Sequence, residues 1–185
     1  MRTLFIHPTD PSTEFLNSVY ADYVDNDDVT IIEGTRISHA VIKKALKDAD
    51  RIIFMGHGTE YGLLDMIGNR YVITSKDLQF FRNKPVICYW CNANIFVDKY
   101  DLNAFATGMF VSEIKEANWF NLPMDQNLID ASNNLFCKIL SRCLFDDVNT
   151  IMNVIDRAYV DNNNPIICFN RECMGLEPKS LAQSL

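Results

Sequence analysis

The sequence predicts an α/β fold, a three-layer sandwich with a mostly parallel central sheet in a flavodoxin-like strand order. Short apolar runs alternate with amphipathic segments in the first half of the 185-residue chain. The runs at residues 51–55 and 85–89 are apolar through their centres, which is typical of strands buried on both faces of a parallel sheet. Strands that alternate with helices place helices on both faces of one sheet, so we expect a single domain over residues 1–185.

The expected elements of the N-terminal half follow from these runs and from helix start signals. We expect strands at residues 3–6, 29–32, 51–55 and 85–89, and a short strand or hairpin at 71–73. Asp10 with Pro11 behind it predicts the start of a helix that runs to about residue 23. A second helix follows Thr35 or Ser38, and a short one covers residues 75–81.

The second half gives weaker signals. The pattern predicts helices at residues 95–102, 125–144 and 150–160, and strands at 105–111 and 165–169. Residues 177–185 are polar, and we expect a frayed tail there.

Composition narrows the classes of partner. Apolar residues make up 48% of the chain and charged residues 22%, which fits a globular protein and is too apolar for a disordered one. The net charge is −7 and no basic stripe is present, so we expect no nucleic-acid partner, because phosphate binding needs clustered Lys and Arg.

The cellular setting is also an expectation from composition. No window approaches the ~20 apolar residues that span a bilayer, and the first residues lack the apolar stretch of a signal peptide. Three of the six cysteines, Cys88, Cys137 and Cys168, lie within apolar runs, where a reduced cysteine acts as a small hydrophobe. We therefore expect a cytoplasmic protein with reduced cysteines and no membrane partner.

Two strand ends carry groups suited to catalysis. His57 follows the strand at 51–55, and Cys91 follows the strand at 85–89. If the strands are neighbours they lie ~5 Å apart, so imidazole and thiol could meet at the carboxyl edge of the sheet. A thiol needs such a base, because the thiolate is the nucleophile. Gly58 lets the backbone approach a substrate, and its N–H could form an oxyanion hole with that of Cys91.

These segments carry a family resemblance. The stretches Ile-Ile-Phe-Met-Gly-His-Gly at 52–58 and Val-Ile-Cys-Tyr-Trp-Cys-Asn at 86–92 resemble the caspase-like superfamily of cysteine peptidases, which includes caspases, metacaspases, gingipains and CHAT-type peptidases. The resemblance covers about residues 51–111. It implies a caspase-like sandwich and a His57–Cys91 dyad that hydrolyses peptide bonds through an acyl-enzyme, without a cofactor.

One departure from the family supports an alternative function. The family usually has a small residue before the cysteine, whereas Trp90 stands here, and Asn92 begins a turn that differs from the usual small one. An inactive relative, a binding or regulatory module for a protein partner, is therefore the first alternative. A flavodoxin-like nucleotide-binding domain is the second, although residues 7–13 after the first strand contain no glycine and two prolines.

Further residues are candidates for substrate binding. His7 ends the first strand at the same edge, and Asp65 follows His57 in a loop where it could orient the histidine or recognise a basic group. Trp90 and Asn92 flank the candidate nucleophile. Cys88 and Cys91 form a C-x-x-C pair, but no second pair exists, so we expect no metal site. The sequence leaves the preferred substrate side chain and the oligomeric state open.

Overall fold

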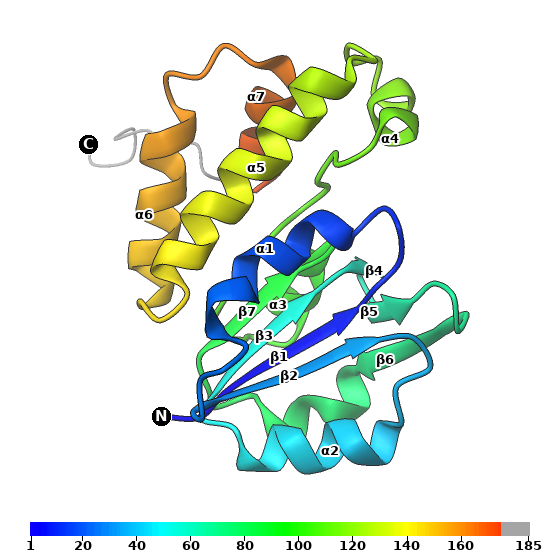
Figure 1. Cartoon of the computed structure of the whole chain (residues 1–185), viewed down its shortest axis with the longest axis vertical. Helices are drawn as coiled ribbons and strands as arrows, with labels where there is room; N and C mark the ends of the chain where they lie inside the picture. The colour runs from blue at the N-terminus through cyan, green and yellow to red at the C-terminus, as the bar shows by residue number, and fades with distance from the viewer. Residues whose placement is uncertain (175–185) are drawn as a thin grey trace, which may run out of the picture.

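Five parallel strands form the central sheet of the computed structural model, which describes residues 1–174 (Figure 1). The strand order β2-β1-β3-β7-β8 is the flavodoxin-like order 2-1-3-4-5, so the expected fold class is confirmed. Adjacent strands pair in parallel at every step. The strands are β1 (Thr3–Pro8), β2 (Val29–Gly34), β3 (Arg51–Met55), β7 (Val86–Tyr89) and β8 (Ala104–Ala106).

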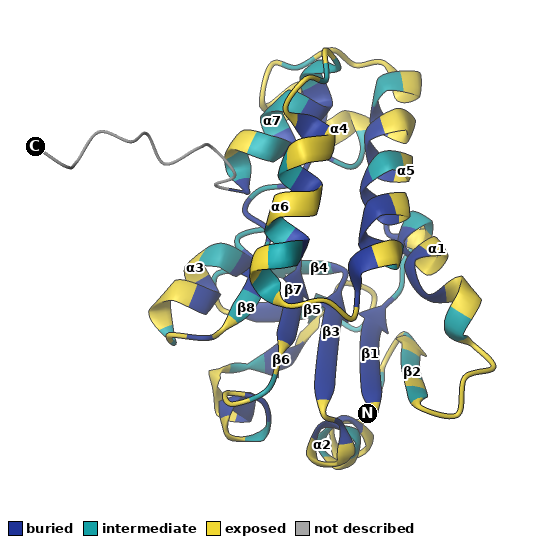
Figure 2. Cartoon of the chain, turned by 90° about the vertical axis from the view of Figure 1, so that its left-hand side faces the viewer, coloured by how far each residue is buried: buried dark blue, intermediate teal, exposed yellow. Residues whose placement is uncertain are grey.

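Helices cover both faces of this sheet. On one face lie α1 (Asn17–Tyr20), α5 (Gln126–Cys143) and α6 (Val148–Tyr159); on the other lie α2 (His39–Asp48) and α3 (Ala93–Lys99). Successive residues of a strand contact helices on opposite faces of the sheet, because their side chains point alternately to the two faces. Ile53 and Met55 pack beneath α1 and α5, whereas Ile52 and Phe54 pack beneath α2. Figure 2 shows the resulting buried sheet between the helices.

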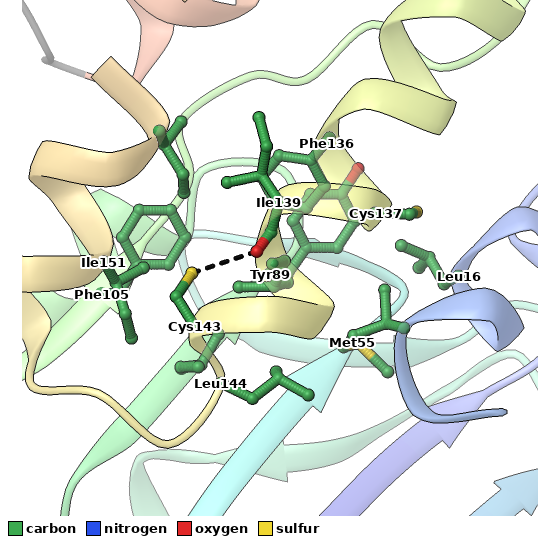
Figure 3. Close-up of a cluster of buried hydrophobic side chains, with 14 of the residues drawn as sticks. Leu16, Met55, Tyr89, Phe105, Phe136, Cys137, Ile139, Cys143, Leu144 and Ile151 are labelled. Carbon is green, nitrogen blue, oxygen red and sulfur yellow. Dashed lines mark hydrogen bonds between the residues drawn. The ribbon is translucent and has the colours of Figure 1, made fainter. Parts of the chain in front are cut away.

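The larger core lies on the α5 face and is rich in aromatic and sulfur-containing side chains (Figure 3). Tyr89 stacks on Phe136 with ring centroids 4.6 Å apart, which joins β7 to α5. Arg51 joins the other end of α5 to β3: its guanidinium donates to the carbonyl oxygens of Leu144, Phe145 and Asp146 at 2.9 Å each. These bonds satisfy the carbonyls of the C-cap residue and of the two residues that follow α5.

A small antiparallel sheet grows directly from the end of β3. It contains β4 (His57–Thr59), β5 (Gly62–Asp65) and β6 (Arg70–Thr74), of which only β6 was expected from the sequence. Gly56 makes the turn out of β3 with φ +135°, a conformation that favours glycine. His57 is therefore the first residue of a new strand and is held by its pairing with Leu64.

The structure corrects several expected elements in the first half. The helix expected from Asp10 to about residue 23 is divided into a 3₁₀ turn η1 (Glu14–Leu16), α1 and a second 3₁₀ turn η2 (Ala21–Tyr23). Of the two expected starts for α2, Ser38 is the N-cap. The short helix η3 (Ser75–Phe80) has Thr74 as its N-cap, and the Thr74 hydroxyl and the Asp77 carboxylate form a capping box.

In the second half, the strand expected at 165–169 is wrong. That segment is α7 (Pro165–Cys173): the Asn164 side chain accepts from the N–H of Ile166, and Pro165 occupies the first turn. The strand expected at 105–111 is only the short β8, and a helix that was not expected, α4 (Ile114–Trp119), follows it. The helices expected at 125–144 and 150–160 are confirmed as α5 and α6, and their N-caps are Asp125 and Asp147. The tail expected from residue 177 lies outside the described residues.

Within residues 1–174, every helix is too short or too polar to traverse a lipid bilayer.

Candidate active site

His57 and Cys91 line one pocket at the carboxyl edge of the sheet. The pairing of Met55 with Tyr89 aligns the ends of β3 and β7, and each candidate residue lies two positions beyond its strand. The Gly56 N–H donates to the Tyr89 carbonyl at 3.0 Å and continues this alignment past the strands. The topology thus brings together the two residues that the sequence placed at neighbouring strand ends.

The imidazole of His57 is oriented by the loop after β1. His57 Nε2 lies 3.0 Å from Asp10 Oδ2 and 2.8 Å from Ser12 Oγ. The other Asp10 oxygen, Oδ1, accepts from the Ser12 N–H at 2.8 Å and from the Ser12 hydroxyl at 2.7 Å. A carboxylate beside Nε2 favours the tautomer with its proton on Nε2, which leaves the lone pair on Nδ1.

The environment of Asp10 keeps it ionised. Burial opposes ionisation, but hydrogen bonds from Ser12 and the charge of His57 outweigh it, so the pKa of Asp10 lies below its ordinary value. Ser12 is not the nucleophile of a serine triad, because its hydroxyl and the carboxylate meet the same imidazole nitrogen. In a triad the nucleophile and the orienting acid use opposite nitrogens.

Cys91 sits on a tight turn between β7 and α3. Asn92 follows it with φ 64° and ψ 24°, in the left-handed region, and α3 begins at Ala93. The Asn92 N–H donates to the Gly108 carbonyl at 3.1 Å, which fixes the turn against the strand-end loop after β8. This strand–turn–helix geometry projects the residue before Asn92 at the sheet edge, on the face that α1 and α5 cover.

The Cys91 thiol is protonated in this resting arrangement. Burial raises its pKa to about 11, although hydrogen bonding from the Phe110 backbone acts in the opposite direction. Within residues 1–174, no hydrogen bond joins Cys91 to His57.

The pocket between the two residues is narrow. Its open space is about 20 Å³, enough for roughly one water molecule. Aromatic residues form much of the wall: Phe15, Tyr89, Trp90 and Phe110 all line the pocket.

Trp90 lies largely beneath β4. Its ring is buried and packs against Gly58, where an added Cβ would overlap the indole. The indole N–H donates to the Thr59 carbonyl at 2.9 Å, and the ring makes edge contacts with Phe54 and Phe96. Trp90 thus supports the strand that carries His57, and one part of it also lines the pocket. Gly58, the expected oxyanion donor, is not among the residues that line that pocket.

The other expected substrate-binding residues lie outside the pocket. His7 is fully buried, with Nδ1 3.0 Å from the Tyr20 hydroxyl. Asp65 is the buried last residue of β5, where its carboxylate accepts from the N–H groups of Arg36 at 2.6 Å and Gly68 at 2.7 Å. Asn92 forms the turn after Cys91 but does not line the pocket.

Three residues of the site were not singled out from the sequence. Asp10 was interpreted as a helix cap and Ser12 as part of a loop. Both follow β1 closely, and this position at the carboxyl edge of the sheet was the signal that could have identified them. Glu116, from the unexpected helix α4, is buried in the pocket wall; its Oε2 accepts from the Ser112 N–H at 2.8 Å and the Ser112 hydroxyl at 3.1 Å. Burial raises the pKa of Glu116, against the hydrogen bonds from Ser112.

In the part of the chain that the structure describes, no cluster of three or more His, Cys, Asp or Glu side chains could bind a metal ion. Cys88 and Cys91, the C-x-x-C pair, are both free thiols. Comparisons of the sequence with models of known protein families and with curated proteins found no match.

Proposed function

We propose that this protein is a cysteine-dependent hydrolase that cleaves peptide bonds, with Cys91 as nucleophile and His57 as general base. The observation that carries the proposal is the placement of both residues in one pocket, with the carboxylate of Asp10 3.0 Å from Nε2 of His57. The resemblance of segments 52–58 and 86–92 to caspase-like peptidases supports the same pair.

The proposed reaction begins with a neutral thiol. As Cys91 Sγ attacks the substrate carbonyl, its proton moves to Nδ1 of His57, and Asp10 stabilises the imidazolium through Nε2. The tetrahedral intermediate expels the amine, which takes the proton back from His57 and leaves an acyl-enzyme on Cys91. Water, activated by His57, then releases the acid. The backbone N–H of Cys91 is the candidate oxyanion donor, whereas Gly58, which was also expected to donate, lies outside the pocket.

The proposed setting is the cytoplasm, with a polypeptide as substrate. All six cysteines are free thiols in the structure. Reduced thiols favour a reducing compartment over an oxidising one.

The alternative function is a caspase-like binding module without catalysis. Two observations favour it: the small space between His57 and Cys91, and the Cys91 pKa near 11. Both describe a site that is closed at rest, and in a hydrolase the substrate would have to open it.

Labelling by peptide electrophiles separates the two functions. The purified protein is treated with a library of peptides that carry a thiol-reactive group, and modified residues are located by mass spectrometry. Cys168 and Cys173 are internal references, because they are free and partly accessible like Cys91. For a hydrolase, labelling is selective for Cys91 and is lost in His57→Ala. Labelling no faster than at Cys168 or Cys173 and indifferent to His57 would leave the binding module.

A further inference from the structure

A second thiol lies near Cys91. Cys173, the last residue of α7, is a free cysteine and is only partly buried, as Cys91 is. Burial is the main reason that the pKa of Cys91 is raised, and Cys173 raises it further, because two thiolate charges would repel each other. This repulsion weakens with distance, so the two sulfurs lie near one another.

The backbone shows how the two cysteines come together. Gly108, in the loop after β8, accepts a hydrogen bond at its carbonyl from the N–H of Asn92, the residue after Cys91, at 3.1 Å. The carbonyl of Cys173 lies so close to Gly108 that a Cβ at this position would overlap it. Gly108 therefore contacts both the turn that carries Cys91 and the end of α7 that carries Cys173.

A buried asparagine fixes α7 against the same loop. Asn170 Oδ1 accepts from the N–H of Val111 at 2.7 Å, and Asn170 Nδ2 donates to the carbonyl of Val111 at 3.1 Å. Cys173 follows Asn170 by three residues, so both lie on the same face of the helix. The backbone of Phe110, the neighbour of Val111, is hydrogen-bonded to Cys91. Both α7 and Cys91 are thus held by the short segment at residues 108–111.

Cys88, the other member of the C-x-x-C pair, does not face Cys91. Side chains alternate along β7 and just beyond it: Cys88 and Trp90 pack in the core on the α2 face, whereas Tyr89 packs in the core on the α5 face. Cys91 continues this alternation and lines a pocket together with Tyr89. The two thiols of the motif therefore point to opposite faces of the sheet.

The helix α7 covers the face to which Cys91 points. It packs with α5 and α6 (Figure 1). Ile167 of α7 and Met174, which follows its last residue, belong to the same core as Tyr89. The end of α7 therefore approaches the turn of Cys91 from the side on which the thiol lies.

We propose that Cys91 and Cys173 are a redox-sensitive thiol pair, and that a disulfide between them switches off the nucleophile of the proposed hydrolase. The effect on activity rests on the proposed function, whereas the disulfide itself needs no catalysis and can be measured without it. Disulfides that form in a reducing compartment are usually transient and redox-sensing, which fits a bond that blocks a reactive thiol reversibly.

The oxidant in this proposal is a small disulfide such as glutathione disulfide. The pocket at Cys91 has room for roughly one water molecule, so the oxidant meets Cys173 first. The Cys173 thiol loses its proton and attacks one sulfur of the oxidant, and the other sulfur leaves and is protonated to a thiol. The Cys91 thiolate then attacks Sγ of Cys173 and expels the second thiol. Two protein thiols are oxidised, and one small disulfide is reduced to two thiols.

The first test identifies the disulfide directly. The purified protein is incubated with glutathione disulfide at pH 8, the remaining thiols are blocked, and a non-reducing digest is analysed by mass spectrometry. We expect a cross-linked pair of peptides that contains Cys91 and Cys173, at least about tenfold more abundant than any pair that contains Cys168. Absence of this pair, or pairing of Cys91 chiefly with another cysteine, would overturn the proposal.

Cys168→Ser is the matched control for Cys173→Ser. Both cysteines lie on α7 and are free and partly buried, but the Cys168 thiol donates to the carbonyl of Asn162. After oxidation, labelling of Cys91 by iodoacetamide should fall at least about tenfold in the wild type and in Cys168→Ser, and should recover with dithiothreitol.

The variant without the second thiol gives the opposite expectation. Cys173→Ser should keep the labelling rate of the untreated protein after oxidation, with its fold checked by circular dichroism. Cys173→Ala is a second variant that removes the same thiol. Loss of labelling in these two variants as large as in the wild type would show that Cys91 is oxidised without Cys173, which contradicts a thiol pair.

A further comparison separates this inference from the proposed function. The peptide electrophiles are applied to the reduced and to the oxidised protein. If the Cys91–Cys173 disulfide forms but no electrophile labels Cys91 selectively in the reduced protein, the disulfide stands and the hydrolase proposal fails. If Cys91 is labelled selectively and oxidation leaves the rate unchanged, the hydrolase stands and the thiol pair fails.

Discussion

Asp10 Oδ2 lies 3.0 Å from His57 Nε2, so a carboxylate from the loop after β1 holds the imidazole that begins β4. The two residues are brought together by the parallel pairing of β1 with β3, since each lies just beyond one of these strands. The contact uses the nitrogen that the proposed proton transfer does not need. The geometry therefore assigns Asp10 the role of positioning and polarising His57.

Replacing Asp10 with asparagine tests that role. The amide keeps the size of the carboxylate but can present an N–H to Nε2, which favours the wrong tautomer, and it cannot stabilise an imidazolium. We expect Asp10→Asn to slow labelling of Cys91 by a peptide electrophile by about 10- to 1,000-fold, measured as a second-order rate constant across pH 5–9.

Ser12→Ala is the matched comparison for this variant. It removes the hydroxyl that contacts both Asp10 and His57 but leaves the carboxylate in place. Its effect should be smaller than that of Asp10→Asn, and the pH profile should keep its shape. Equal rates for Asp10→Asn and the wild type would show that the contact has no part in activating the thiol.

The resting state of Cys91 gives a prediction about pH. Burial raises its pKa to about 11, so the thiolate fraction grows nearly tenfold per pH unit below that value. We expect alkylation by iodoacetamide, a small reagent that does not mimic a peptide, to accelerate in this proportion from pH 7 to pH 10 without a plateau. The modified fraction of Cys91 is followed by mass spectrometry, with Cys91→Ser to confirm the site. A plateau below pH 9 would mean a preformed thiolate and would contradict the closed resting state.

Much of the fold was predictable because its strongest signals are local. Continuously apolar strands and the caps Asp125 and Asp147 identify parallel strands and long helices without tertiary information. The segment at 165–169 shows where this fails. A run of five residues that begins with Pro165 fits a buried strand and a buried helix equally well. The side chain of the preceding Asn164 caps the N-terminus of α7, and this cap is what favours the helix.

The candidate site was predictable only in part, for a topological reason. His57 and Cys91 each follow an obvious strand, and a parallel sheet places such residues at one edge. Asp10 reaches His57 through the conformation of the loop after β1, and Glu116 enters from a helix beyond β8. Neither contact leaves a local pattern, because both depend on how distant loops fold over the sheet edge.

The packing of Gly58 on Trp90 predicts a sensitive position. A Cβ at residue 58 would overlap the indole and lie 2.6 Å from the Gly62 carbonyl oxygen, so β4 must shift. We expect Gly58→Ala to lower the free energy of unfolding by about 1–3 kcal/mol, measured by urea denaturation. It should also slow peptide labelling of Cys91, since β4 carries His57.

Gly34→Ala is the control for this prediction. A Cβ added at Gly34 would meet no atom within 4 Å. Only the positive φ of Gly34, +102°, therefore opposes the substitution. Labelling of Cys91 should be unaffected by Gly34→Ala. If Gly58→Ala were as stable and reactive as the wild type, β4 would not be constrained by Trp90.

The buried His7 predicts a loss of stability in acid. Burial lowers its pKa to about 4, although Glu33 and Asp10 pull the value upward and His57 adds to the lowering. In the unfolded chain its pKa is near 6.5, so unfolding takes up a proton between these values. The stability that His7 contributes is complete above pH 6.5 and is lost as the pH falls toward 4. The difference of about 2.5 pKa units corresponds to roughly 3 kcal/mol.

His7→Asn isolates this contribution. The asparagine amide can still donate to the Tyr20 hydroxyl that contacts Nδ1 of His7, but it does not titrate. Urea denaturation at pH 7.0, 5.5 and 4.0 should show the wild type losing roughly 3 kcal/mol more than His7→Asn over this range, because other titrating groups affect both proteins equally. An equal loss of stability in the two proteins would mean that His7 is protonated in the folded state. Its Nε2, which is buried and has no partner within residues 1–174, would then have to donate to one.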